Sequence, residues 1–155
     1  MTKPNTGTFG NFLIQVGDGA SPEMFSAPCG FTNKAFNETA NMQETSVPDC
    51  TDPDAPAYVE RAVDTLSSEI NASGVLAMPA AGEDPDTGTS AFNVFRRFYS
   101  AAVSKNCRIY LQGVSGGYYE GKYILSQFNK GVQKGQKINV DITLSSDGEW
   151  DWVPA

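Results

Sequence analysis

The chain has 155 residues, of which 40% are hydrophobic and 19% charged, so it is long enough for one packed domain and too apolar for global disorder. Its net charge of −7 argues against a basic nucleic-acid-binding patch, because phosphate contacts need clustered Lys and Arg. The sequence contains no histidine, which excludes Ser-His and Cys-His nucleophile pairs and every metal site that uses His.

The three cysteines, Cys29, Cys50 and Cys107, predict reduced thiols in a protein made in the cytoplasm. They are far apart and odd in number, and no CxxC motif occurs, so neither a disulfide framework nor a zinc site is indicated. The first ten residues lack the apolar stretch of a signal peptide. No apolar run approaches the roughly 20 residues that a membrane-spanning helix needs. We therefore expect no membrane segment and no cofactor.

Turns and short strands are expected in the first third of the chain. Fifteen glycines and nine prolines favour a β-rich fold. Residues 1–10 are small and polar and predict a flexible N-terminal arm. Short apolar runs predict strands at 11–16 and 23–27, and a further strand is expected around Asn33–Ala40.

Residues 46–56 form a loop by composition, with three prolines and three aspartates. The aspartates do not follow the D-x-D-x-D-G spacing of a calcium loop, so a solvated loop is favoured over a metal site. A rigid, exposed loop also suits docking against a partner. Its candidate contact residues are Pro48, Asp49, Asp52, Pro53 and Asp54.

Segment 58–71 is ambiguous between helix and strand, whereas the pattern of 91–105 predicts a helix. In 58–71 the apolar spacing favours a helix, although several of the same residues also share one strand face. Residues 78–90 read as a loop rich in Pro, Gly and acids. Ser90 then suits an N-cap, and aromatic residues repeat every three or four positions, which predicts an amphipathic helix over Ala91–Lys105.

Strands follow at 106–112 and 118–130, and the clearest pattern comes last. From Ile138 to Leu144 apolar and polar residues alternate without exception, which predicts a strand with one buried face. Residues 145–148 supply turn chemistry, and Trp150 and Trp152 then lie on a C-terminal arm, 146–155. The predicted fold is mainly β: a β-sandwich or open barrel with one packed helix.

This C-terminal hairpin resembles the end of the major tail tube proteins of long-tailed bacteriophages, siphophage-type or from a related gene transfer agent. The matching residues are Val140, Ile142, Thr143, Leu144, Ser145, Ser146, Gly148 and Trp150. A second similar stretch is Val63–Ala77, a strand followed by a turn of small residues and glycine. The single helix between that strand and the last hairpins also has the family's position.

The resemblance implies that 58–71 is a strand and that the protein is a virion tail component without enzymatic activity. It implies rings of six copies that stack into a hollow tube, an inner β-barrel shared between subunits, and arms and a long loop that bridge rings. DNA is then a transient, non-specific cargo of the lumen. The tape-measure protein, the tail terminator and the tail tip proteins become expected partners.

On this reading, polar residues of the last hairpin become lumen candidates: Lys122, Asn139, Asp141 and Thr143. Trp150 and Trp152 become inter-subunit contacts, so deleting Glu149–Ala155 is expected to leave a folded monomer that cannot build tubes. Two other functions stay open. A β-sandwich binding module for carbohydrate or a receptor could stack sugar rings on Tyr118, Tyr119 and the two tryptophans. An enzyme with two carboxylates, such as a glycoside hydrolase, is less favoured because no acidic pair stands out.

Overall fold

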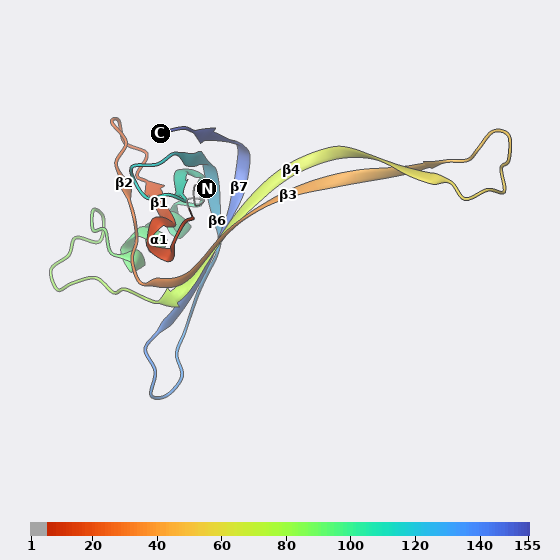
Figure 1. The fold of residues 1–155 in the computed structure, drawn as a ribbon. Helices are drawn as coiled ribbons and strands as arrows, with labels where there is room; N and C mark the ends of the chain where they lie inside the picture. Colours follow the sequence, from red (N-terminus) through yellow and green to blue (C-terminus); the bar gives the residue numbers. More distant parts are fainter. Residues whose placement is uncertain (1–5) are drawn as a thin grey trace.

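The computed structural model describes residues 6–155, which form one antiparallel sheet and one α-helix (Figure 1). The seven strands have the spatial order β2-β1-β5-β6-β7-β4-β3. The elements in chain order are the 3-10 turn η1 (Phe9–Asn11), β1 (Leu13–Gly17), β2 (Phe25–Ser26), β3 (Phe31–Val47), β4 (Tyr58–Val75), α1 (Ala91–Ala101), β5 (Lys105–Tyr110), β6 (Tyr118–Gly131) and β7 (Asn139–Val153). The predicted mainly β fold with one packed helix is confirmed.

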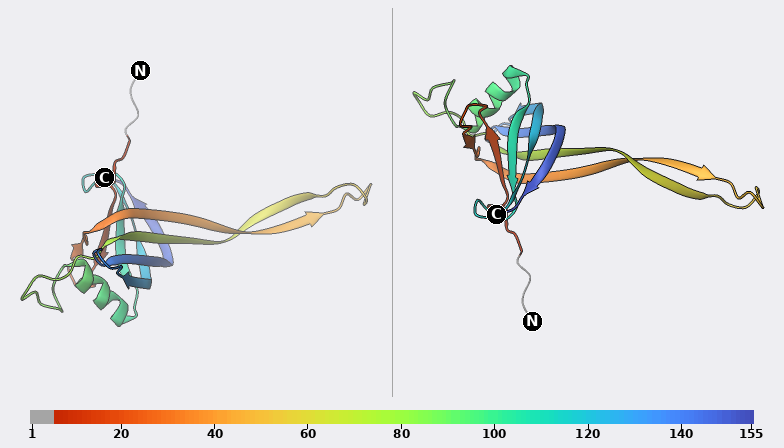
Figure 2. Two further views of the ribbon diagram at one scale, coloured as in Figure 1. Left: turned by 90° about the horizontal axis from the view of Figure 1, so that it is seen from below. Right: turned by 90° about the horizontal axis from the view of Figure 1, so that it is seen from above.

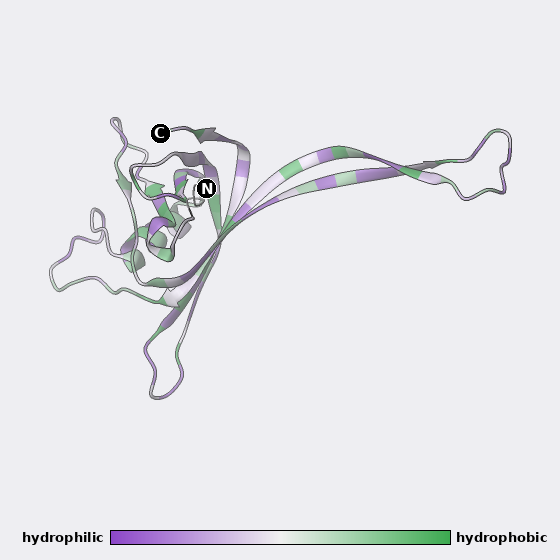
Figure 3. Cartoon of the chain, viewed as in Figure 1, coloured by the Kyte–Doolittle hydropathy of each residue, from purple (hydrophilic) through white to green (hydrophobic). Residues whose placement is uncertain are grey.

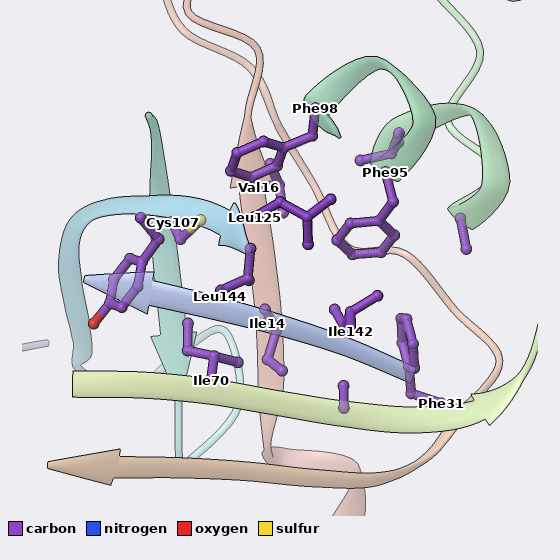
Figure 4. Close-up of a cluster of buried hydrophobic side chains, with 14 of the residues drawn as sticks. Ile14, Val16, Phe31, Ile70, Phe95, Phe98, Cys107, Leu125, Ile142 and Leu144 are labelled. Atoms are coloured by element: carbon purple, nitrogen blue, oxygen red, sulfur yellow. The ribbon is translucent and has the colours of Figure 1, made fainter. Parts of the chain in front are cut away.

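Strands β6 and β7 connect the two halves of the sheet because both are long enough to belong to each half. Residues 118–123 of β6 pair with β5, whereas residues 139–145 of β7 pair with β4. Between these regions the β6–β7 ladder has register shifts at Gly121/Tyr123 and Leu125/Gln127. Such irregularities bend and twist strands. The sheet therefore folds over itself, and β1 runs steeply across β7 and β4 in Figure 4.

The hydrophobic core lies between the folded halves of the sheet and beneath α1 (Figure 4). Val140, Ile142 and Leu144 of β7 are at most 2% exposed, which confirms the predicted alternation. Burying an aliphatic side chain stabilises the fold by about 1.5–3 kcal/mol, so a one-residue slip of β7 would be strongly unfavourable. Ile138, expected on the same face, precedes β7 and is exposed.

Helix α1 begins where predicted and ends four residues early. The Ser90 hydroxyl accepts a hydrogen bond from the Asn93 backbone N–H, and the Glu83 carboxylate accepts from the Ser90 hydroxyl and the Asn93 side chain at 2.8 and 2.7 Å. These bonds lower the pKa of Glu83 and tie the preceding loop to the helix. Ala102 is left-handed, with φ 52°, and stops the helix, so Lys105 opens β5 instead.

Segment 58–71 is a strand, as the family resemblance implied and against its helical spacing. Strand β4 pairs with β3 from Phe31–Gly74 to Val47–Tyr58. Both strands are longer than predicted, and β3 continues well beyond Ala40. Backbone hydrogen bonds between the two strands satisfy every second peptide group along this length. The spacing of apolar residues within 58–71 carries no information about this pairing.

The N-terminal arm is only partly within the described residues, since 1–5 lie outside them. Residues 9–12 lie against β3. The Lys34 ammonium group donates to the Phe12 carbonyl at 2.9 Å and lies 4.8 Å from the centre of the Phe9 ring. Within residues 6–155, no helix is long and apolar enough to cross a membrane.

The C-terminal segment differs most from its prediction. The expected turn at 145–148 and the separate arm at 146–155 are wrong, because β7 continues unbroken to Val153. Gly148 has φ 97°, so the strand bends there without reversing direction. Beyond the bend, β7 stays paired with β6, from Gly121–Trp150 to Tyr118–Val153.

A buried hydroxyl pair offers a test of the packing where the sheet folds. The Tyr123 ring is fully buried, and its hydroxyl lies 2.7 Å from Ser68 Oγ. Burial raises the pKa of Tyr123 to about 12, against the opposing effect of that hydrogen bond, so the hydroxyl stays protonated. We expect Tyr123→Phe to lower the free energy of unfolding by about 1–3 kcal/mol, because it leaves Ser68 Oγ buried without its partner.

Urea denaturation followed by tryptophan fluorescence measures this loss. The control is the double variant Tyr123→Phe with Ser68→Ala, which removes both hydroxyls and should be more stable than Tyr123→Phe alone. A single variant as stable as the unmodified chain would contradict a structural role for the hydrogen bond.

Candidate assembly surfaces

The face of the sheet opposite the core is polar over β4, β6 and β7. Asn139, Asp141 and Thr143 occupy successive outward positions of β7, between the buried positions of the same strand. Lys122 is exposed on β6 next to fully buried Tyr123, so it also points away from the core. The structure therefore brings the four lumen candidates to one face, with Lys122 nearer the bend.

Uncharged side chains dominate this polar face, and sequence reasoning missed most of them. Thr143 is flanked by Asn71 on β4 and Gln127 on β6, and its hydroxyl lies 3.1 Å from Asn71 Oδ1 and 3.4 Å from Gln127 Oε1. Ser73 and Asn129 flank Asp141 in the same way. Only the register between strands shows that these residues share a face.

Few charged side chains lie on the polar face. Where β4, β7 and β6 run side by side, over residues 69–75, 139–145 and 123–131, Glu69 and Asp141 are the acidic residues at outward positions. Lys122 lies at the border of this region. Most of the chain's acidic residues are therefore elsewhere, on the hairpin, the loops and the bend of β7.

Strand β3 ends the sheet and leaves one edge of its backbone without a partner strand. It pairs with β4 alone, along 17 residues, whereas the opposite edge strand, β2, has two residues. An exposed edge presents unpaired N–H and C=O groups to any extended chain that approaches. The long β3 edge is thus open to pairing with another polypeptide.

The outer parts of β3 and β4, residues 38–47 and 58–68, leave the body of the molecule as a two-stranded hairpin (Figures 1 and 2). Strand β7 pairs with β4 only from Glu69 onward, so the hairpin has no third strand. Ten residues of strand span roughly 33 Å. A two-stranded ribbon is marginally stable in water by itself, so this one is suited to docking on another surface.

Figure 3 shows hydrophobic positions along both strands of this hairpin. The register places Met42, Val59, Val63 and Leu66 on one side, where the Arg61–Glu44 ion pair separates Val59 from the other three, and we call these four residues the apolar stripe. Met42 and Val63 face each other across the ribbon, and Leu66 faces Ala40 on the same side. The stripe residues are 52–68% exposed. The other side carries polar pairs such as Asn41 and Thr65, joined at 2.9 Å. The stripe is therefore a candidate contact surface.

The five predicted loop residues, Pro48, Asp49, Asp52, Pro53 and Asp54, lie together at the exposed end of the hairpin. Asp49 Oδ1 accepts hydrogen bonds from the Thr51 backbone N–H at 2.8 Å and the Thr51 hydroxyl at 2.7 Å, which lower the pKa of Asp49. In the described part of the chain, no group of three or more His, Cys, Asp or Glu side chains is arranged to hold a metal ion.

The two tryptophans lie in the body of the molecule and both have partners there. Trp150 Nε1 donates to Glu38 Oε1 at 3.1 Å, which links β7 to the base of the hairpin. The Trp152 ring packs edge-on against Tyr119, with ring centres 5.0 Å apart, and remains 46% exposed. Neither tryptophan joins the loop residues.

A family model of phage tail tube proteins matches residues 7–151. The chain belongs to the phage tail tube protein family. This confirms the resemblance noted in the sequence and makes the chain a structural component of a virion tail rather than an enzyme. No curated protein matches its sequence.

Solved structures with the same fold also include tail and tube proteins. The tail of an empty gene transfer agent particle, refined with C6 symmetry, matches with a TM-score of 0.70 and 13% identity, covering 94% of this chain and 98% of that one. The SPP1 tail tube matches at 0.59 and 7%, covering 96% and 79%. A chain of the sheath–tube complex of an extracellular contractile injection system matches with a TM-score of 0.56 and 10% identity, covering 96% of this chain and 91% of that one. At these identities the likeness shows the tail tube fold.

The described contacts of the C-terminal segment revise the expected effect of its deletion. Removing Glu149–Ala155 from this tail tube protein takes away four residue pairs between β7 and β6 and both tryptophan contacts. We expect the free energy of unfolding to fall by at least about 2 kcal/mol, because cross-strand pairs and large aromatic side chains are lost together.

Thermal unfolding of the truncated chain measures this effect. Deletion of Pro154 and Ala155 alone is the control, since both follow the end of β7 and should leave stability unchanged. Equal stability of the longer truncation and the complete chain would show that the C-terminal end of β7 is dispensable for folding, as the sequence had predicted.

Proposed function

We propose that six copies of this tail tube protein close into a ring and that rings stack into a hollow tube through which DNA passes to the host. The sixfold symmetry of the similar gene transfer agent tail supports this number. A head-to-tail contact closed by rotation makes a ring, whereas one left open along the axis makes a filament. A tail tube needs both kinds of contact.

The observation that carries this proposal is the β3–β4 hairpin. It extends from the body with its apolar stripe uncovered and with one free edge along β3. Covering the stripe and the edge with neighbouring copies would remove apolar surface from water and satisfy backbone groups. We assign the loop at the hairpin's end, Pro48 to Asp54, to contacts between subunits.

We assign the polar face of the sheet to the lumen. The opposite face is covered by the core and α1, so this is the face that strands can present to an enclosed channel. Apart from Lys122 at its border, this face carries neutral amides and hydroxyls that give DNA phosphates no cationic partner, and Asp141 and Glu69 repel them at short range. Passage without adhesion is the behaviour that this wall supports.

The remaining partners belong to the lumen and the two ends of the tube. We infer that a tape-measure protein occupies the lumen before DNA does, and that tail terminator and tail tip proteins bind the terminal rings. Exposed Trp152 remains a candidate contact between copies, since nearly half of its surface is free. A carbohydrate-binding role is not supported, because the side chains proposed to stack on sugars have partners within the molecule: Tyr118 packs on Tyr110, Tyr119 packs on Trp152, and Trp150 donates to Glu38.

Substitution of the apolar stripe tests assembly through the hairpin. We expect Met42→Asn with Val63→Asn to lower the yield of tubes by more than about tenfold while the chain stays folded, because it replaces apolar contact surface by polar groups on both strands. Negative-stain electron microscopy counts the tubes, and thermal unfolding checks the fold.

The matched control is Gln43→Asn with Ala62→Asn, the next pair along the hairpin, on its polar side. It introduces the same side chains into the same ribbon and should leave tube yield near that of the unmodified chain. Equal losses from both pairs would indicate a general effect on the hairpin, and equal tube formation by the stripe variant would exclude the stripe from assembly.

Added positive charge tests the lumen assignment. We expect Asn71→Lys in the native particle to leave tails of normal length but reduce DNA delivery by more than about tenfold, because each ring then offers DNA new phosphate contacts. The titre of infecting or gene-transferring particles measures delivery. Asn71→Asp is the control and should deliver DNA normally. Normal delivery with Asn71→Lys would place this face outside the lumen.

A further inference from the structure

The connection between β6 and β7 forms a second projection from the body, with a charge opposite to that of the first (Figure 1). Residues 130–138 contain three lysines and no acidic residue. We call Lys130, Lys134 and Lys137 the lysine loop. All three are exposed, and Lys130 rests over the Phe128 ring, 4.0 Å from its centre. No described ion pair involves these lysines.

The end of the β3–β4 hairpin is the acidic counterpart. Residues 48–57 contain three aspartates and no basic residue. We call Asp49, Asp52 and Asp54 the acidic tip. The nearest basic residue along the hairpin, Arg61, is already paired with Glu44 at 2.8 Å, so within the hairpin the acidic tip is not neutralised.

The acidic tip and the lysine loop cannot meet within one molecule. Figures 1 and 2 show that the two hairpins leave the body in different directions, and the acidic tip lies at the far end of the longer one. Each projection therefore ends in solvent with a single sign of charge. Two acidic tips or two lysine loops would repel each other, whereas a tip and a loop from different copies attract.

We propose that in the assembled tube the acidic tip of one copy contacts the lysine loop of another copy. This inference rests on the proposed tube-forming function and names the two surfaces that meet. The contact joins two different surfaces, so it is heterologous and repeats from copy to copy, as a tube requires. It also sets the direction in which copies add, because the reversed arrangement brings like charges together.

Exposed charge pairs of this kind are individually weak and are screened by salt, with a Debye length of about 10 Å at 0.1 M. Their effect accumulates because every copy in a tube contributes both surfaces. Assembly is then expected to slow as the salt concentration rises. The apolar stripe lies on the same hairpin and is far less sensitive to salt, so the two contributions can be separated.

Charge reversal with rescue tests the pairing. We expect Asp52→Lys with Asp54→Lys, and separately Lys134→Glu with Lys137→Glu, each to reduce tube yield at low salt by more than about tenfold. Combining all four substitutions restores opposite charges with their signs exchanged and should recover most of the yield. The control matched to the acidic-tip variant, Asp86→Lys with Asp147→Lys, makes the same change of charge at exposed positions outside both surfaces.

Cross-linking tests whether the surfaces lie together. Cys50 is an exposed thiol beside the acidic tip, and Cys107 is buried, which raises its pKa to about 12 and keeps it unreactive. In a chain with Cys29→Ser and Gln133→Cys, a short bismaleimide should link Cys50 of one copy to position 133 of another. Assembled tubes then give a ladder of multimers on a denaturing gel. Adding Cys50→Ser should abolish the ladder.

The outcomes separate this inference from the proposed function. A ladder together with charge rescue supports the pairing. Intact tubes that give no ladder, or charge reversals that change tube yield no more than the control does, overturn the pairing and leave the tube proposal standing. A failure of the unmodified chain to form tubes, both in isolation and in its native particle, overturns both.

Discussion

One-sided burial of β7 is the constraint on which the rest of this structure depends. Val140, Ile142 and Leu144 are held against the core, and the residues between them face the other way. Pairing with β4 on one side and β6 on the other extends the same division across three strands. The sheet therefore has a packed face and a polar face, and the polar face is the one that we propose lines the lumen.

The outer part of the β3–β4 hairpin projects from the body and contributes no residue to the core. In the hairpin, residues 38–47 of β3 and 58–68 of β4 have no third strand, and the apolar stripe is exposed to water. A chain that worked alone would be protected from aggregation by shortening or charging such a hairpin. In the tube that we propose for this family member, neighbouring copies cover the stripe, the β3 edge and the acidic tip.

Local sequence features predicted the elements whose stability is local. Ser90 and the aromatic repeat after it located the start of α1, and the alternation from Ile138 to Leu144 located the first half of β7. Errors occurred where pairing over long distances decided the outcome. Segment 58–71 has helical spacing but is held as a strand by β3, and 145–148 looks like a turn but bends within a continuous strand paired to β6.

The sequence by itself determined the mainly β class, the inward face of β7, an exposed loop at 46–56 and the family, through residues near the C-terminus. Only the tertiary structure decided which polar residues share a face with Asp141, that Trp150 and Trp152 pack within the molecule, and that the acidic tip and the lysine loop lie on separate projections. The reason is physical. Alternation and capping act between residues close in the chain, whereas register joins positions as distant as Asn71 and Thr143.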